Sequence, residues 1–194
     1  KEFDDLVVTD VSVFLDLNKL ALRGVGDVTS VESMIKAAAA TIRVAILKSH
    51  RVQVFAIGRY PDHIPPAGGW PHLLTVLDRM TLYRAGGRHD FAKEVGVRFA
   101  LLPPGGTVVL IVTATNFDLE SMRPIIDRMI DDRMRVVAVV VDDRSFLKLY
   151  FEQEATHIRA LQLPAIVREL KRMGCRVFTA ESGDDLRVRM EMPR

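Results

Sequence analysis

Short runs of apolar, mostly β-branched residues recur along the chain, and they constrain the possible folds more than any other feature. The runs lie at residues 6–9, 52–57, 108–112 and 136–141, with a weaker fifth at 176–179. Because they are nearly continuous rather than alternating, they are typical of strands covered on both faces. Amphipathic helical patterns separate them, at residues 31–46, 119–130 and 164–174. This alternation predicts an α/β fold of three layers, with a mostly parallel central sheet and helices on both faces.

The middle of the chain is less regular. Residues 60–69 hold three prolines and two glycines, which indicates a loop or a short edge strand. Helical patterns follow at residues 70–83 and 91–102, separated by a Gly-Gly turn at 86–87. No internal repeat or domain boundary is visible in 194 residues, which is close to the length of one domain. We therefore expect a single domain over 1–194, excised from a longer protein because its first residue is not Met.

The composition is that of a globular chain without a strong charge bias. Apolar residues make up 48%, charged residues 27%, and the net charge is +2, with no basic stripe for nucleic acid. The single cysteine, Cys175, excludes an internal disulfide and a cysteine-rich zinc site, and it fits a reducing compartment. No apolar run approaches the roughly 20 residues of a membrane span. We expect a cytoplasmic domain, either free or on the cytosolic side of a membrane-anchored protein, without membrane contact of its own.

Polar residues that follow the apolar runs are the candidates for a functional site. In open α/β sheets, ligands bind outside the carboxyl ends of the strands, at a point where the strand order reverses. Asp10 and Ser12 directly follow the first run, and we expect them at that edge. The third run is followed by Thr113, Asn116 and Asp118. These side chains are therefore expected to gather at one edge of the sheet.

Two further polar groups are expected at the same edge. The turn at residues 86–90 contributes His89 and Asp90, and the fourth run is followed by Asp142 and Asp143. Each has a purely structural alternative: Asp90 as the N-cap of the next helix, the Asp142-Asp143 pair as caps, and His89 as a solvated turn residue.

The residues Asp10-Val11-Ser12 after an apolar strand, with a long α/β chain behind them, resemble a von Willebrand factor A domain. More narrowly, the chain resembles the bacterial family known as domain of unknown function fifty-eight. That likeness is carried by residues 1–6, 86–90, 174–177 and 184–186. The resemblance implies a three-layer α/β fold with a metal-ion-dependent adhesion site at the carboxyl edge of the sheet.

The adhesion site of such domains reads Asp-x-Ser-x-Ser, followed by a threonine from a central loop and an aspartate after a later strand. Magnesium favours this kind of oxygen ligand and keeps some of its waters. Asp10 and Ser12 match the first two positions, but Phe14 takes the place of the second serine and cannot ligate. His89 takes the place of the threonine.

The last aspartate of the pattern falls near Thr113-Ala114, so its carboxylate is missing unless Asp118 reaches back. The resemblance therefore implies a degenerate site that binds magnesium weakly or not at all. Its metal candidates are Asp10, Ser12, Thr113 and Asp118. Its candidates for contact with a partner are His89, Asp90 and Asn116.

The resemblance implies a protein-interaction module, of a kind often linked with AAA+ ATPases of the MoxR type. An alternative is a metal-dependent nuclease or phosphoesterase, in which strand-end carboxylates converge for two-metal chemistry. Its carboxylates would be Asp10, Asp90, Asp118 and Asp142. Ser12 and the lack of a basic groove argue against this enzyme. A third hypothesis is a structural domain whose site has decayed.

Three other features have modest weight. Residues 146–151 carry apolar side chains around most of a helix, which indicates core packing or, alternatively, an exposed aromatic patch. Glu152, Glu154 and His157 form a local cluster for which a metal site is the weaker interpretation. The glycines at 24 and 26 lack the third glycine of a dinucleotide fingerprint.

Overall fold

The computed structural model describes residues 8–148 and 162–183. Several features expected from the sequence lie outside these residues. They are the segments 1–6 and 184–186, the last part of the apolar run 146–151, and the cluster of Glu152, Glu154 and His157.

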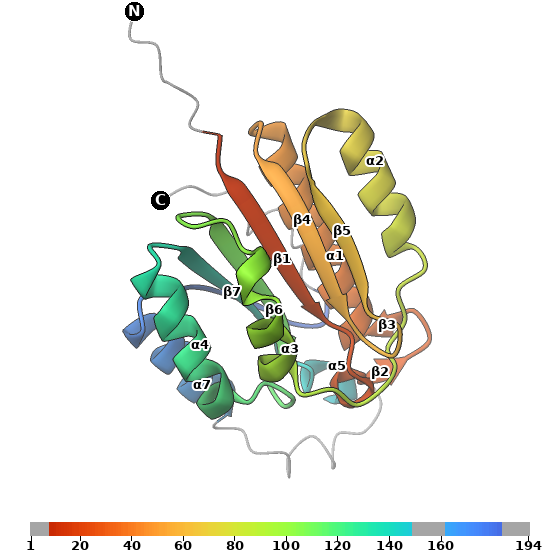
Figure 1. Ribbon diagram of the computed structural model, residues 1–194. Helices are drawn as coiled ribbons and strands as arrows, with labels where there is room; N and C mark the ends of the chain where they lie inside the picture. Colours follow the sequence, from red (N-terminus) through yellow and green to blue (C-terminus); the bar gives the residue numbers. More distant parts are fainter. Residues whose placement is uncertain (1–7, 149–161, 184–194) are drawn as a thin grey trace, which may run out of the picture.

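A six-stranded sheet forms the middle layer (Figure 1). Its strands are β1 (Asp10–Asp16), β4 (Arg51–Ile57), β5 (Asp62–Ala67), β6 (Thr107–Thr113), β7 (Arg135–Val141) and β8 (Arg176–Ala180). Their order across the sheet is β5-β4-β1-β6-β7-β8. All neighbours are parallel except the β4–β5 pair, which is antiparallel. The predicted three-layer fold with a mostly parallel sheet is therefore confirmed.

Helices cover both faces of the sheet. One face carries α1 (Ser30–Leu47) and α2 (Gly69–Met80), and the other carries α3 (Phe91–Val97), α4 (Leu119–Asp131) and α7 (Gln162–Arg172). The remaining elements are α5 (Ser145–Lys148), the 3-10 helices η1 (Lys19–Ala21) and η2 (Phe99–Leu101), and a hairpin of β2 (Gly24–Val25) with β3 (Val28–Thr29). Within residues 8–148 and 162–183, no helix has both the length and the apolar character needed to cross a membrane.

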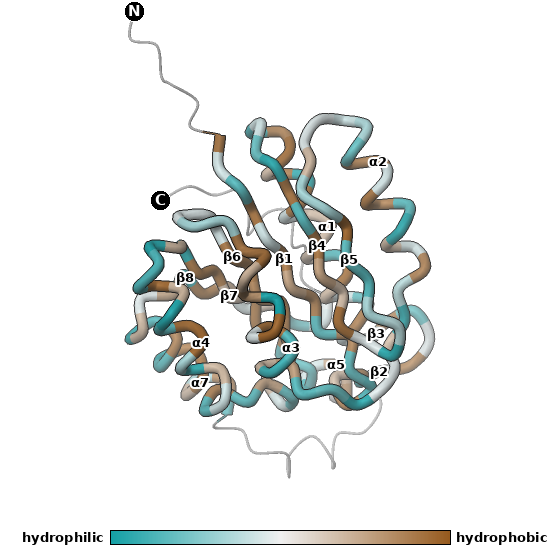
Figure 2. Tube along the Cα trace, in the orientation of Figure 1, coloured by the Kyte–Doolittle hydropathy of each residue, from teal (hydrophilic) through white to brown (hydrophobic). Residues whose placement is uncertain are grey.

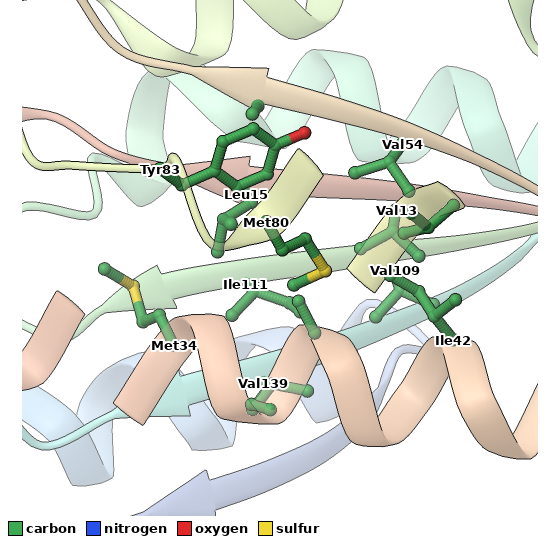
Figure 3. Packing of buried hydrophobic residues seen from close by; sticks show 14 of the residues in the cluster. Val13, Leu15, Met34, Ile42, Val54, Met80, Tyr83, Val109, Ile111 and Val139 are labelled. Carbon is green, nitrogen blue, oxygen red and sulfur yellow. The ribbon is translucent and has the colours of Figure 1, made fainter. Parts of the chain in front are cut away.

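Strand residues point alternately into two hydrophobic clusters. Val13 and Leu15 pack toward α1 and α2, whereas Phe14 packs toward α3 and α4. All three side chains are fully buried, and burying one such side chain contributes about 1.5–3 kcal/mol. Figure 3 shows the first cluster, in which strand side chains meet Met34 from α1. The hydropathy colouring shows the apolar strands in the middle of the molecule (Figure 2).

The edge strand β5 explains the proline-rich stretch at 60–69. It pairs antiparallel with β4 and has Pro65 and Pro66 in its sequence. A proline has no N–H for a ladder bond, so it is tolerated at an edge. The prediction of a loop or short edge strand is therefore confirmed as an edge strand.

The helix boundaries match the amphipathic patterns. Helix α1 begins after Thr29, whose hydroxyl accepts from the Glu32 N–H at 3.1 Å, as the capping pattern predicts. In contrast, the pattern at 91–102 divides into a short helix and a 3-10 turn.

The first strand is where the sequence prediction was wrong. The apolar run at 6–9 was expected to be the strand, but β1 begins at Asp10 and ends at Asp16. The strand was misplaced because Asp10 and Ser12 were interpreted as the polar residues that follow it. In the fold Ser12 is 1% exposed, and its hydroxyl accepts from Gln53 Nε2 on β4 at 2.7 Å. A partner for its polar atom lets Ser12 lie inside the sheet.

Candidate functional site

The strand order reverses at β1, since β4 lies on one side of it and β6 on the other. At such a point the connections leave in opposite directions and open a crevice outside the carboxyl ends of the strands. The residues at the ends of β1 and β6 therefore line the expected site. The turn at 86–90 reaches the same place, because the Lys19 N–H donates to the Gly87 carbonyl at 3.0 Å.

Asp16, the last residue of β1, lies at the centre of this edge. It is 1% exposed. Its Oδ1 accepts from the Asn18 backbone N–H at 3.0 Å, and its Oδ2 accepts from Asn116 Nδ2 at 2.8 Å. Burial raises the pKa of Asp16, while these hydrogen bonds and the His89 side chain act in the opposite direction. A carboxylate is thus held in a desolvated position by two amide donors.

Asn18 connects the end of β1 to the turn at 86–90. Its Nδ2 donates to the His89 carbonyl at 2.8 Å, and its Oδ1 accepts from the Leu20 N–H at 3.0 Å. Asn18 is 2% exposed. Both ends of its side-chain amide are therefore used to fix the two loops in place.

The imidazole of His89 lies against the backbone of the same turn. Its Nε2 is buried and has no hydrogen-bond partner among the described residues. Gly87 makes room for it: its φ is +74°, and a Cβ there would meet His89 Nε2 at 2.4 Å. The turn therefore requires glycine both for its backbone conformation and for the ring beside it.

A cavity of about 340 Å³ opens beside these groups. It is lined from three directions: by Asn18 after β1, by His89 and Asp90 in the turn, and by Asn116 and Asp118 after β6. The structure thus brings together the sequence candidates His89, Asp90, Asn116 and Asp118.

Two of these candidates serve as helix caps. Asp90 Oδ1 accepts from the Lys93 N–H at 3.0 Å, which confirms the N-cap alternative. Asp118 caps α4 by accepting from the backbone of Glu120 and Ser121, and also from the Ser121 hydroxyl. Hydrogen bonds from Ser121 lower the pKa of Asp118. Both Asp118 oxygens are engaged in this cap, so they are not directed at Asp16.

A second buried carboxylate, Asp143, follows β7. It is fully buried, accepts from both the N–H and the hydroxyl of Thr115, and lies 3.9 Å from Arg23 Nε. Burial raises its pKa despite these partners. The Thr113 hydroxyl is also buried and has no partner within the part of the chain that the structure describes.

Asp10 and Ser12 do not belong to this site. Asp10 starts β1 at the amino edge of the sheet and lies 3.5 Å from Arg51 Nε. Ser12 is buried within the same strand and bonded to Gln53. The expectation that both leave the first strand at its carboxyl end is wrong, because the strand begins at Asp10 and ends six residues later at Asp16.

The convergence of four aspartates expected for two-metal chemistry does not occur either. Asp10 lies at the opposite edge of the sheet, and Asp90 and Asp118 cap helices. Asp142 Oδ1 accepts from Arg144 Nε at 2.9 Å. Among the described residues, no three side chains of histidine, cysteine, aspartate or glutamate gather as a metal site would require.

Comparison with solved structures identifies the architecture. The chain superimposes on the BatB protein of Bacteroides thetaiotaomicron with a TM-score of 0.67 and 9% identity, over 94% of this chain and 95% of that one. An aerotolerance-related membrane protein from Bacteroides fragilis gives a TM-score of 0.66 and 10% identity, over 94% and 95%. Proximal thread matrix protein 1 of the mussel byssus, with a zinc-occupied adhesion motif, gives 0.55 and 11%, over 94% and 46%.

The fold is von Willebrand factor A-like. No family model matches the sequence, and no curated protein matches it either.

Because β1 ends at Asp16, the expected spacing Asp-x-Ser-x-Ser is realigned to start there. Asn18 and Leu20 would then take the places of the two serines. Sequence reasoning missed Asp16 and Asn18. The available signal was the spacing Asp-x-Asn directly after the run Val-Phe-Leu, which repeats the spacing of Asp10 and Ser12 with asparagine in place of serine.

Proposed function

We propose that this domain is a protein-interaction module that binds its partner at the crevice beside Asp16, in the position of a degenerate metal-ion-dependent adhesion site. The observation that carries this proposal is the hydrogen bond from Asn116 Nδ2 to Asp16 Oδ2 at 2.8 Å. An amide donor faces the carboxylate oxygen that a metal ion would otherwise face. The crevice would then recognise a partner through hydrogen bonds rather than through a shared metal.

The residue types around Asp16 support weak or absent magnesium binding. A magnesium site needs several oxygen ligands in octahedral geometry. In the realigned pattern Leu20 and Ala114 supply none, and both oxygens of Asp16 already accept hydrogen bonds. His89 takes the place of the threonine, and imidazole suits transition metals better than magnesium.

The partner-contact surface would consist of the groups that reach the 340 Å³ cavity from its rim. His89, Asp90 and Asn116 remain the proposed contact residues. Asp90 and Arg88 are exposed, so a partner would first meet charged side chains and then the amides behind them. Rims of this kind set specificity and orientation more than affinity.

Membership of the domain-of-unknown-function-fifty-eight family and cooperation with a MoxR-type AAA+ ATPase are part of the same proposal. They rest on the sequence resemblance carried by residues 1–6, 86–90, 174–177 and 184–186. A position on the cytosolic side of a membrane-anchored protein is also proposed. The likeness to an aerotolerance-related membrane protein supports it only through the shared fold.

Partner capture with matched variants tests this proposal. The immobilised domain and the variants Asp16→Ala and Asn116→Ala are compared for the proteins that they retain from an extract of the source cell. Asp10→Ala is the control, because it removes an aspartate from the opposite edge of the same strand. We expect both site variants to lose, at least tenfold, proteins that the control retains. Equal retention by all four proteins would overturn the proposed site.

A further inference from the structure

A second cavity, of about 500 Å³, lies on the other side of the molecule from the candidate site. It opens at the amino edge of the sheet, on the face that carries α1. Its floor consists of strand side chains from β1, β6, β7 and β8, and the wall beside it is the last part of α1. The volume falls within the range of small-molecule sites, about 300–1,000 Å³.

The floor of this groove is apolar because of the strand alternation. Val11, Val109, Val137 and Phe178 point to the α1 face, and Val44 of α1 lines the wall. Val137 and Phe178 remain only partly buried, so α1 does not cover this part of the sheet completely. Figure 3 shows Val109 and Val139 of the same face next to α1.

Basic side chains gather at one end of the groove. Lys48 follows the end of α1, His50 precedes β4, and Arg135 and Arg176 are the first residues of β7 and β8. Arg176 also lies over the Phe178 ring, with 5.0 Å between its Cζ and the ring centroid. Within the described residues, no carboxylate forms an ion pair with Lys48, Arg135 or Arg176.

The lowered pKa of His50 agrees with this concentration of positive charge. Burial lowers the pKa of His50, and the charges of Arg135 and Lys48 lower it further. The His50 Nδ1 lies 3.2 Å from both the Thr9 N–H nitrogen and the Thr9 hydroxyl. Lys48, Arg135 and Arg176 thus place positive charge at the mouth of an apolar groove, while Asp10 at the same edge lies beside Arg51.

We propose that this groove binds a single-chain amphiphile with an anionic head group, such as a fatty-acid carboxylate. The apolar tail would lie over Val137 and Phe178, and the head group would meet Lys48, Arg135 and Arg176. The separation of charge from apolar surface favours this occupant. An acidic amphipathic helix would instead need basic partners along the whole groove. This site is independent of the one at Asp16.

Calorimetric titration with laurate below its micelle concentration tests the proposal directly. Dodecyltrimethylammonium has the same tail with the opposite charge, and butyrate has the same head with a short tail. We expect saturable binding of one laurate per chain, with at least tenfold weaker binding of both control ligands. Equal binding of the cationic and anionic amphiphiles would overturn the proposal, because it would indicate non-specific apolar adsorption.

Two variants address the head and the tail of the ligand separately. Lys48→Glu combined with Arg135→Glu reverses the charge at the mouth, and Val44→Trp fills the groove from its α1 wall. Each should weaken laurate binding at least tenfold. Arg43→Glu is the matched control, since Arg43 is exposed on the same helix and does not line the groove. Thermal melting of each variant verifies that it is folded.

Co-sedimentation with vesicles separates this proposal from a membrane surface. Vesicles of phosphatidylglycerol would retain the domain if the basic edge recognised a lipid bilayer. Retention by these vesicles without binding of monomeric laurate would overturn the proposal in favour of a membrane. Saturable laurate binding that the charge reversal abolishes would support the proposed binding site in the groove. That conclusion would not depend on the outcome of partner capture at Asp16.

Discussion

Asn116 Nδ2 donates a hydrogen bond of 2.8 Å to Asp16 Oδ2, joining two residues that are 100 positions apart in the sequence. The bond connects the end of β1 to the loop after β6, across the point where the strand order reverses. It gives a buried carboxylate a neutral partner rather than a cation. The properties of the candidate site follow from this pairing.

The first prediction concerns the stability cost of Asp16. Burial raises its pKa, so the folded state holds the proton more tightly than the unfolded state does. Its contribution to stability is therefore greatest at low pH and is lost as pH rises above the ordinary value of 3.8 and through the raised value. We expect Asp16→Asn to melt about 2–4 °C higher than the wild type at pH 7, as about 1 kcal/mol would produce.

Melting curves between pH 4 and pH 8 would measure this effect. Asp16→Asn should also show a weaker fall of the melting temperature with rising pH. Asp143 contributes in the same direction, since burial raises its pKa as well, so part of the pH dependence should persist. A variant that melts lower than the wild type throughout would mean that the ionised carboxylate is stabilising, contrary to the burial argument.

The second prediction tests whether an amide has taken the position of a metal. Asn116→Asp directs a second carboxylate at Asp16 and should lower the melting temperature in metal-free buffer through like-charge repulsion. Millimolar manganese should then raise the melting temperature, because binding at tenfold excess over the dissociation constant adds about 1.4 kcal/mol to the free energy of unfolding. The wild type should respond far less.

Asn116→Leu is the control for this experiment, because it removes the same hydrogen bond without adding a charge. It should be insensitive to manganese. A wild-type domain that is stabilised by magnesium or manganese as strongly as Asn116→Asp would argue against a degenerate site.

The fold was largely predictable because each layer has its own periodicity. Four of the five expected strands appear at nearly the expected bounds, since apolar residues dominate their runs even where a polar residue such as Gln53 lies within one. The first strand was misplaced because Ser12 and Asp16 lie within it. Hydrophobicity cannot reveal that Ser12 is satisfied by Gln53, which is 41 positions away. That partner exists only once β1 and β4 are paired.

The candidate site was only partly predictable for the same reason. The turn residues His89 and Asp90 and the strand-end residue Asn116 were correctly expected at one edge, because the carboxyl ends of parallel strands meet there. Asp16 and Asn18 were missed, since their recognition depends on where β1 ends. Because the end of this strand was predicted six residues too early, Asp10 lies at the opposite edge of the sheet and Ser12 lies within the strand.

The third prediction separates structural from functional roles on β1. Ser12→Ala removes the acceptor of the 2.7 Å bond from Gln53 Nε2, which keeps the Leu101 carbonyl at 3.1 Å as its second partner. We expect a loss of about 1 kcal/mol in the free energy of unfolding, measured with urea. Partner capture should be unchanged. A selective loss of capture without a loss of stability would return Ser12 to the functional site.

The fourth prediction concerns the hydrogen bonds that connect α2 and the residues after it to the edge strand β5. The buried Tyr83 donates to Asp62 Oδ2 at 2.9 Å, and Arg79 binds the same carboxylate from outside. Burial and the neighbouring carboxylate raise the pKa of Tyr83, so its hydroxyl stays protonated and keeps donating under alkaline conditions. Figure 3 shows its ring beside Leu15 and Met80.

Tyr83→Phe keeps this ring packing and removes only the hydroxyl donor, so we expect a loss of about 1 kcal/mol in the free energy of unfolding. Tyr60→Phe is the matched control, because Tyr60 is 80% exposed and its substitution should change stability by less than about 0.5 kcal/mol. Urea denaturation of both variants measures the difference. If Tyr83→Phe proved as stable as Tyr60→Phe, the Arg79–Asp62 pair alone would be sufficient to hold β5 against α2.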